Sequence, residues 1–244
     1  MSGPLLVAHR GAPRGGAAEN TIRAFREAVA AGADGVELDV RGTRDGRVVV
    51  LHDEAVVRGG RRVPVRSLAL EDLRDPSVEV HDRVPPLEEA IRALLMRAGV
   101  VVEVKEPGLE EKVASILASL KAESRLPWLL VASFHPSVLK ALARRAPGLR
   151  RALVVSPRGP GLAGALRGRI PVAAWRSSGA HDLMPDRGLV DAALVAKVAA
   201  AGGRVLPWTV NDPAEARRVI DAGAEGVISD DLAAVGPEVR GGER

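Results

Sequence analysis

The feature that most constrains this chain is a repeated alternation between short apolar runs and segments in which apolar residues recur at helical spacing. The apolar runs occupy residues 5–8, 35–40, 100–104, 129–133, 152–155, 172–175, 205–210 and 226–229. The clearest helical patterns lie at residues 21–31, 87–96, 109–120, 136–145, 190–200 and 213–221. Strands that alternate with helices of about ten residues indicate parallel β/α units. Eight such runs favour a closed barrel over an open sheet.

The length supports the same fold class. The chain has 244 residues, and a (β/α)8 TIM barrel typically uses about 250. We therefore predict an α/β protein with one such barrel over residues 1–244. A β-hairpin and a short insertion, at about residues 53–86, follow the second strand, and residues 236–244 form a frayed tail. No Gly-x-Gly-x-x-Gly turn follows the first strand, which argues against a Rossmann-type sheet.

Composition excludes several classes of function. The net charge is +4 and the arginines are interspersed with acids, so no nucleic-acid partner is expected. The chain has no Cys, which excludes disulfides, thiolate metal sites and a Cys nucleophile. No run is long and apolar enough for a signal peptide or a membrane span. We expect a cytoplasmic protein without a stable membrane anchor; its oligomeric state stays open.

Three carboxylates fall at the carboxyl ends of predicted strands, where barrels carry their active sites. Glu37 and Asp39 are two residues apart in one strand, so they project to the same side, and Glu103 ends the next strand. Neighbouring carboxylates repel unless a cation lies between them. Oxygen ligands favour Mg²⁺, Ca²⁺ or Mn²⁺ over zinc. Ion pairing with nearby Arg or Lys is the alternative interpretation.

Two histidines accompany these carboxylates. Asp45-Gly46 is a strong hairpin signal, and a two-residue turn there pairs residues whose numbers sum to 91, which places His52 opposite Asp39. His9 follows the first strand. With Arg10 and Lys105, these imidazoles supply the parts for phosphodiester cleavage: a proton acceptor, a proton donor and cations that neutralise charge on phosphorus. Alternatively, His9 only satisfies a backbone carbonyl.

Several segments resemble one known family. They are His-Arg-Gly at 9–11, Glu-Asn-Thr at 19–21, residues 32–40, Asp-Gly at 45–46, Val-Leu-His-Asp at 50–53, residues 84–89, Glu-Val-Lys at 103–105, Ser-Phe at 133–134, Trp-Thr-Val-Asn at 208–211 and residues 223–230. Together they resemble the glycerophosphodiester phosphodiesterases over nearly the whole chain. Small departures, such as Ala18 and Pro86, remove none of the proposed functional residues.

The resemblance implies a barrel fold and roles for individual residues. It implies one divalent cation held by Glu37, Asp39 and Glu103, and general acid and base roles for His9 and His52. The predicted substrate-binding or phosphate-binding residues are Arg10, Lys105, Trp208, Phe134 and Asn20.

The resemblance also implies hydrolysis of a small glycerophosphodiester to sn-glycerol 3-phosphate and an alcohol. Two alternatives stay open, which are phospholipase-D-like hydrolysis of lysophospholipids and a catalytically inactive binding barrel. The sequence does not choose the metal, the alcohol, or which histidine is the acid.

Overall fold

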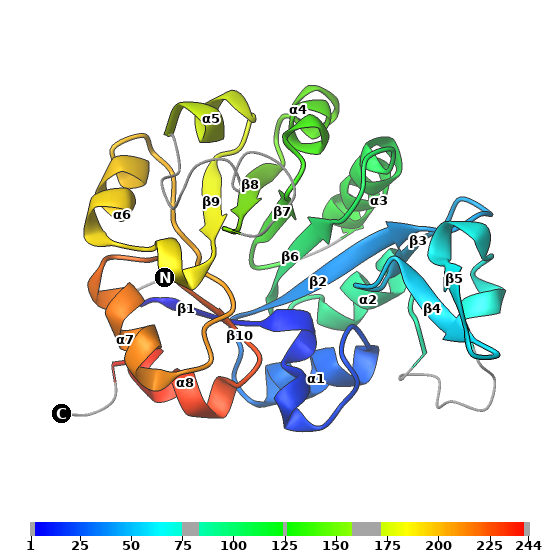
Figure 1. Ribbon diagram of the computed structural model, residues 1–244, viewed down its shortest axis with the longest axis horizontal. Helices are drawn as coiled ribbons and strands as arrows, with labels where there is room; N and C mark the ends of the chain where they lie inside the picture. Colours follow the sequence, from blue (N-terminus) through cyan, green and yellow to red (C-terminus); the bar gives the residue numbers. More distant parts are fainter. Residues whose placement is uncertain (1–2, 75–82, 124–125, 158–171, 242–244) are drawn as a thin grey trace.

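A parallel sheet forms the centre of the molecule. The computed structural model describes residues 3–74, 83–123, 126–157 and 172–241. Its parallel strands follow the spatial order β10-β1-β2-β6-β7-β8-β9. Their bounds are β1 Leu5–Ala8, β2 Gly35–Gly42, β6 Gly99–Val104, β7 Leu129–Ser133, β8 Arg150–Val155, β9 Asp182–Pro185 and β10 Gly226–Ser229. Helices surround these strands (Figure 1), so the predicted α/β barrel class is confirmed.

Helices follow most of the strands and cover the outside of the barrel (Figure 1). Their bounds are α1 Ile22–Ala30, α2 Leu87–Leu94, α3 Glu110–Glu123, α4 Pro136–Arg145, α5 Val172–Ser177, α6 Ala192–Ala199, α7 Pro213–Asp221 and α8 Leu232–Val239. Side-chain caps fix several helix starts. Thr21, Asp191, Asp212 and Asp231 each accept a hydrogen bond from the backbone N–H three residues on.

Residues 205–210 close the ring between β9 and β10. Leu206 N donates to Leu183 O at 2.9 Å, and Ile228 N donates to Pro207 O at 2.9 Å. The segment was predicted as a strand, but it pairs only through isolated bridges, such as Leu183 with Val205. Pro207 explains the interruption because proline has no backbone N–H to donate to a neighbouring strand.

Alternate residues of each strand build two separate layers of apolar packing. Val36 and Leu38 of β2 pack outward in the cluster that includes Phe25 of α1 and Ile91 of α2. A second cluster, which includes Val7, fills the barrel interior. The indole of Trp128 packs on this inner cluster, and a Cβ at Gly35 or Gly99 would overlap it. The amino-terminal end of the barrel is therefore filled, whereas polar side chains occupy the carboxyl ends of β2 and β6.

The predicted hairpin exists, but its register differs by one residue from the prediction. β3 (Val48–Val50) pairs antiparallel with β2, with Val40 opposite Val50, so paired numbers sum to 90. Thr43 N donates to Arg47 O, which makes a three-residue loop, and Gly46 adopts a φ of 75°. Leu51, not His52, consequently lies beside Asp39: its N–H donates to Asp39 O at 2.9 Å.

The predicted insertion contains a second hairpin. β4 (Ala55–Arg58) pairs antiparallel with β5 (Arg61–Pro64), followed by the 3-10 helices η3 (Val65–Ser67) and η4 (Glu71–Leu73). Val65 and Leu70 are buried against Val49 of β3, with Val56 packed on the same cluster. This small core fixes the insertion to the arm formed by β2 and β3, at one side of the barrel (Figure 1).

Two predictions along the chain were wrong. Residues 172–175, predicted as a strand, belong to α5, and the strand is instead β9, Asp182–Pro185. An Ala-containing apolar run of four residues suits helix as well as strand, and β9 begins with Asp and ends with Pro. The predicted frayed tail is also helical as far as Val239, because Gly236 and Val239 are buried against the barrel.

Candidate active site

Three carboxylates meet at the carboxyl ends of β2 and β6. Glu37, Asp39 and Glu103 are 1%, 1% and 7% exposed, and one oxygen from each lies within 4.8 Å of the others. Asp39 and Glu103 are register partners in neighbouring strands, which brings the two side chains together. The structure thus assembles the three residues that the sequence predicts as metal ligands.

Burial, mutual repulsion and neighbouring cations shift the pKa values of the three carboxylates in different directions. Burial raises the pKa of Glu37 well above its ordinary value, and the charges on Asp39 and Glu103 add to the effect. Burial also raises the pKa of Glu103, which Lys105 partly opposes. Burial acts in the same direction on Asp39, but Lys105 and Arg10 outweigh it and lower the pKa of that carboxyl.

Two cations border the carboxylates. Lys105 Nζ lies 2.6 Å from Glu103 Oε1 and 3.2 Å from Asp39 Oδ1. Arg10 Nε lies 3.1 Å from Asp39 Oδ2, and Arg10 Nη1 donates to Glu19 at 3.1 Å. Burial lowers the pKa of Lys105, but Glu103 and Asp39 outweigh it and raise the pKa, so the ammonium stays charged. The structure places both predicted phosphate ligands beside the cluster.

The loop after β1 holds its functional side chains in a strained backbone. Arg10 has a φ of 51°, a left-handed conformation that costs most non-glycine residues about 1–2 kcal/mol, and Asn20 has a φ of 58°, which asparagine adopts more readily. Arg10 N donates to Glu37 Oε2 at 3.1 Å. Asn20 Nδ2 donates to Asp39 Oδ2 at 3.0 Å, and Asp39 N donates to Asn20 Oδ1 at 3.2 Å. The strain therefore accompanies contacts that position the carboxylates.

The donor set fits a divalent cation. Glu37 Oε1 is buried and has no hydrogen-bond partner within the described part of the chain. An unpartnered buried carboxylate oxygen is costly, and a cation among three carboxylates removes that cost. The set holds only oxygen atoms, which suits Mg²⁺, Ca²⁺ or Mn²⁺.

Both predicted catalytic histidines have an aspartate at Nδ1. His9 Nδ1 lies 2.6 Å from Asp230 Oδ1, while His9 Nε2 points toward the cluster, 3.9 Å from Glu37 Oε2. His52 Nδ1 lies 2.9 Å from Asp53 Oδ1. His52 also lies close enough to Asp39 to contribute to lowering the pKa of that carboxyl. In each ring the aspartate orients Nδ1 and leaves Nε2 for another partner.

Asp230 contacts a predicted catalytic histidine, and sequence reasoning assigned it no role. Asn211 Nδ2 donates to Asp230 Oδ2 at 2.8 Å, and Asp230 N donates to Asn211 Oδ1 at 2.8 Å. Burial raises the pKa of Asp230, but hydrogen bonds from His9 and Asn211 outweigh it and lower the pKa. The signal was its position directly after the last strand, in the segment noted for its family resemblance.

Two aromatic side chains lie near Lys105. Phe134 and Trp208 meet edge to face, with ring centroids 5.6 Å apart. Lys105 Nζ lies 5.8 Å from the Phe134 centroid, which connects this pair to the charged residues. Trp208 Nε1 donates to Met184 O at 3.0 Å, so the indole is held in place. The pair forms an apolar wall next to the carboxylate cluster.

Comparison with known proteins decides the family. The model of the glycerophosphoryl diester phosphodiesterase family matches residues 9–234. The chain belongs to this family. A glycerophosphodiester phosphodiesterase of Caldanaerobacter subterraneus subsp. tengcongensis is 31% identical over 93% of this chain and 94% of its own length. The protein is accordingly a phosphoric diester hydrolase.

Solved structures agree with this placement. A putative glycerophosphoryl diester phosphodiesterase from Silicibacter pomeroyi has a TM-score of 0.82 and 25% identity, covering 98% of this chain and 94% of that one. An Oleispira antarctica phosphodiesterase, solved with the product sn-glycerol-3-phosphate, has a TM-score of 0.79 and 25% identity, covering 97% of each chain. Within the described residues of this family member, no helix is long and apolar enough to span a membrane.

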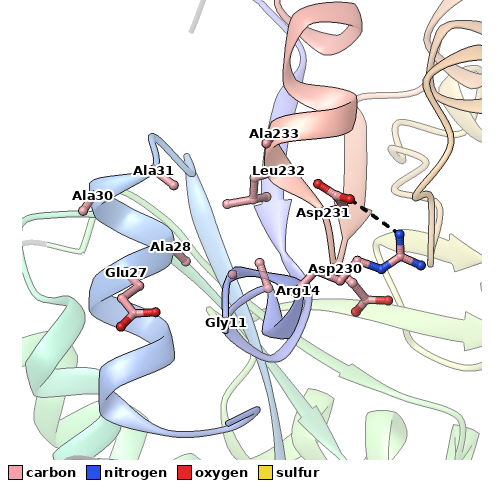
Figure 2. A pocket seen from close by; sticks show the side chains of 12 residues that line it. Gly11, Arg14, Glu27, Ala28, Ala30, Ala31, Asp230, Asp231, Leu232 and Ala233 are labelled. Carbon is pink, nitrogen blue, oxygen red and sulfur yellow. Dashed lines mark ion pairs between the residues drawn. The ribbon is translucent and has the colours of Figure 1, made fainter. Parts of the chain in front are cut away.

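A separate cavity lies outside the barrel, between α1 and α8. It has a volume of about 390 Å³, and Ala28, Ala31 and Leu232 contribute apolar lining. Figure 2 shows Arg14 directed toward Asp231 at its edge, where the two side chains approach to 3.5 Å. Asp230 also borders this cavity, so the residue that supports His9 separates it from the carboxylate cluster.

Proposed function

We propose that this family member hydrolyses soluble glycerophosphodiesters to sn-glycerol 3-phosphate and an alcohol at the site formed by the cluster and the two histidines. The observation that carries the proposal is the buried Glu37, Asp39 and Glu103 cluster, with an unpartnered Glu37 oxygen, beside His9 Nε2. A divalent cation bound there supplies charge stabilisation for the phosphate oxygens.

His9 and His52 exchange the protons. Asp230 and Asp53 fix Nδ1 of the two rings, so each Nε2 is the atom that accepts or donates a proton. One imidazole removes a proton from the nucleophile, water or the glycerol 2-hydroxyl, which bonds to phosphorus as the bond to the alcohol breaks, and the other imidazole protonates the leaving alkoxide. If the 2-hydroxyl attacks first, water then opens the cyclic phosphate to give glycerol 3-phosphate. Neither step requires a side chain to change its hydrogen-bond partner at Nδ1.

Arg10 and Lys105 receive the substrate phosphate. Both are charged and border the carboxylates, so they neutralise the negative charge that grows on the phosphate oxygens during attack. Phe134 and Trp208 form the wall beside the alcohol or glycerol carbons. Asn20 is 3% exposed with both ends of its amide on Asp39, so we assign it to positioning that carboxylate and not to direct substrate contact.

The test is product release by metal-stripped protein, with Mg²⁺, Ca²⁺ or Mn²⁺ added back singly. The products measured are glycerol 3-phosphate from the glycerophosphodiesters and choline from lysophosphatidylcholine. The substrates are glycerophosphocholine, glycerophosphoethanolamine and lysophosphatidylcholine. We expect release from the first two, restored by at least one cation, and unchanged activity in the control His181→Ala, whose ring accepts from Arg151 N away from the cluster. Hydrolysis of lysophosphatidylcholine alone would replace the proposed substrate class, and no turnover with any cation would contradict hydrolysis.

A further inference from the structure

The tip of the β4–β5 hairpin combines exposed apolar surface with unbalanced positive charge. Val57 is 71% exposed, and Met96 is the other large hydrophobic side chain exposed to this extent among the described residues. Gly59 and Gly60, with φ values of 54° and 74°, form the tight turn that makes the tip project. Residues 55–70 contain four arginines, at positions 58, 61, 62 and 66, and no acid.

The arrangement of these arginines costs stability in the free protein. Arg58 and Arg61 are direct cross-strand partners, and like charges in such a pair repel. One acid, Asp72, lies near them, 3.8 Å from Arg58 and shared with Arg44 at 3.6 Å. Within the part of the chain that the structure describes, no carboxylate pairs with Arg61 or Arg66. Among the described residues, the tip therefore has a single anionic partner, Asp72 beside Arg58, and this acid is shared with Arg44.

Two other acids of the described residues lie near the hairpin but away from its tip. Asp53 and Glu54 precede β4 at the end of the hairpin opposite the turn. Arg62, the cross-strand partner of Val57, lies within electrostatic range of Asp53. The hairpin is also held firmly, because Val56 packs on the cluster of Val49, Val65 and Leu70. A rigid tip with an apolar residue among arginines suits an interface that is apolar and anionic together.

We propose that the β4–β5 hairpin docks this protein on an anionic phospholipid surface. Val57 enters the boundary between headgroups and acyl chains, while the arginines at the tip contact lipid phosphates. Phosphate-bearing lipid explains both features at once, whereas a free phosphate ion would leave Val57 without a partner. The arm leaves the carboxyl end of β2, so docking occurs at the same end of the barrel as the carboxylate cluster. The proposal is independent of the catalytic assignment.

Vesicle binding tests the proposal. Co-sedimentation is measured with vesicles of phosphatidylcholine alone and with vesicles of equal parts phosphatidylcholine and phosphatidylglycerol. Wild type is expected to prefer the mixed vesicles, with binding weakened by salt. The double variant Val57→Ser, Arg61→Ser is expected to bind them about thirtyfold more weakly.

The matched control is Met96→Ser with Arg144→Ser, which removes an equally exposed hydrophobic residue and one exposed arginine elsewhere. It should bind like wild type, and both double variants should keep wild-type turnover of soluble substrate. If the hairpin double variant melts at a lower temperature than wild type, vesicle binding is compared between wild type and the single variant Arg61→Ser instead. Equal losses in both double variants, or no preference of wild type for the mixed vesicles, would overturn the proposal.

Discussion

Both ends of the barrel bury carboxylates, but those at one end are paired with arginines and those at the other end face one another. At the amino-terminal end, Asp182 is 1% exposed and both of its oxygens accept hydrogen bonds from Arg150 and Arg204. At the carboxyl end, Glu37 is equally buried, faces two other carboxylates and keeps an unpartnered oxygen. The first arrangement favours stability, and the second fits a bound cation.

The pKa shifts express the same difference. Burial raises the pKa of Asp182, but its hydrogen bonds with Arg150 and Arg204 outweigh burial and lower the pKa. For Glu37 burial and repulsion act together and raise the pKa. A buried carboxylate is therefore no indication of stability by itself, because its neighbours determine whether it stabilises the fold or destabilises it until a ligand arrives.

Glu37→Gln should produce the largest effect on activity, and it should remove the repulsion that distinguishes the carboxylate cluster from the Asp182 network. We expect the rate of hydrolysis to fall about a thousandfold, because the variant loses several kcal/mol of transition-state stabilisation by the cation. The metal-free variant should melt at a higher temperature than metal-free wild type, since a repelled buried charge is removed. Activity assays and thermal melting check both effects, and a lower melting temperature would contradict the unsatisfied cluster.

His9→Ala should separate the general acid from the general base. Loss of either role lowers turnover about 10²–10⁴-fold with an alkyl glycerophosphodiester. If His9 protonates the leaving alkoxide, a substrate with a p-nitrophenol leaving group, which needs no proton, should recover most of this loss. His52→Ala should then show no such recovery. Recovery in both variants, or in neither, would contradict the division of roles.

Asp182→Asn should show the opposite pattern from Glu37→Gln. It removes the charge between two arginines whose side chains are 38% and 37% exposed, so solvent moderates the cost. We expect a loss of about 2 kcal/mol in unfolding free energy with turnover unchanged at moderate temperature. Urea unfolding measures this loss. A stability equal to wild type would show that the amino-terminal network contributes nothing.

The pH dependence gives the smallest and most specific effect. The pKa of Asp182 is lower in the folded state than its unfolded value of about 3.9, so its contribution is complete above that value. It is lost as pH falls through the folded pKa. The stability difference between wild type and Asp182→Asn should stay constant from neutral pH to about pH 5 and shrink below pH 4. A difference that grows on acidification would contradict the lowered pKa.

The sequence was sufficient to predict the barrel and the cluster because both depend on local patterns. Period-two alternation placed Glu37 and Asp39 on one face of β2, and the structure confirms that they meet Glu103. The features that were wrong or missed depend on distant partners. β9 begins with Asp182, whose burial is tolerated only because Arg150 and Arg204 meet it.

Two further cases show the limits of the sequence prediction, the first from a distant partner and the second from a local ambiguity. Asp230 contacts His9 across 221 positions in the chain, a separation that no local pattern reveals. The one-residue register difference in the β2–β3 hairpin follows from the left-handed conformation of Gly46, since Asp45-Gly46 suits both a two-residue and a three-residue loop.

Calorimetric titration of Mn²⁺ into metal-stripped protein tests the central claim most directly. The cluster of Glu37, Asp39 and Glu103 predicts one site in wild type, an equal site in Asp182→Asn, and strongly weakened binding in Glu37→Gln. Wild-type affinity in Glu37→Gln would show that the cation binds elsewhere, and would contradict the assignment of the buried carboxylates as the metal centre.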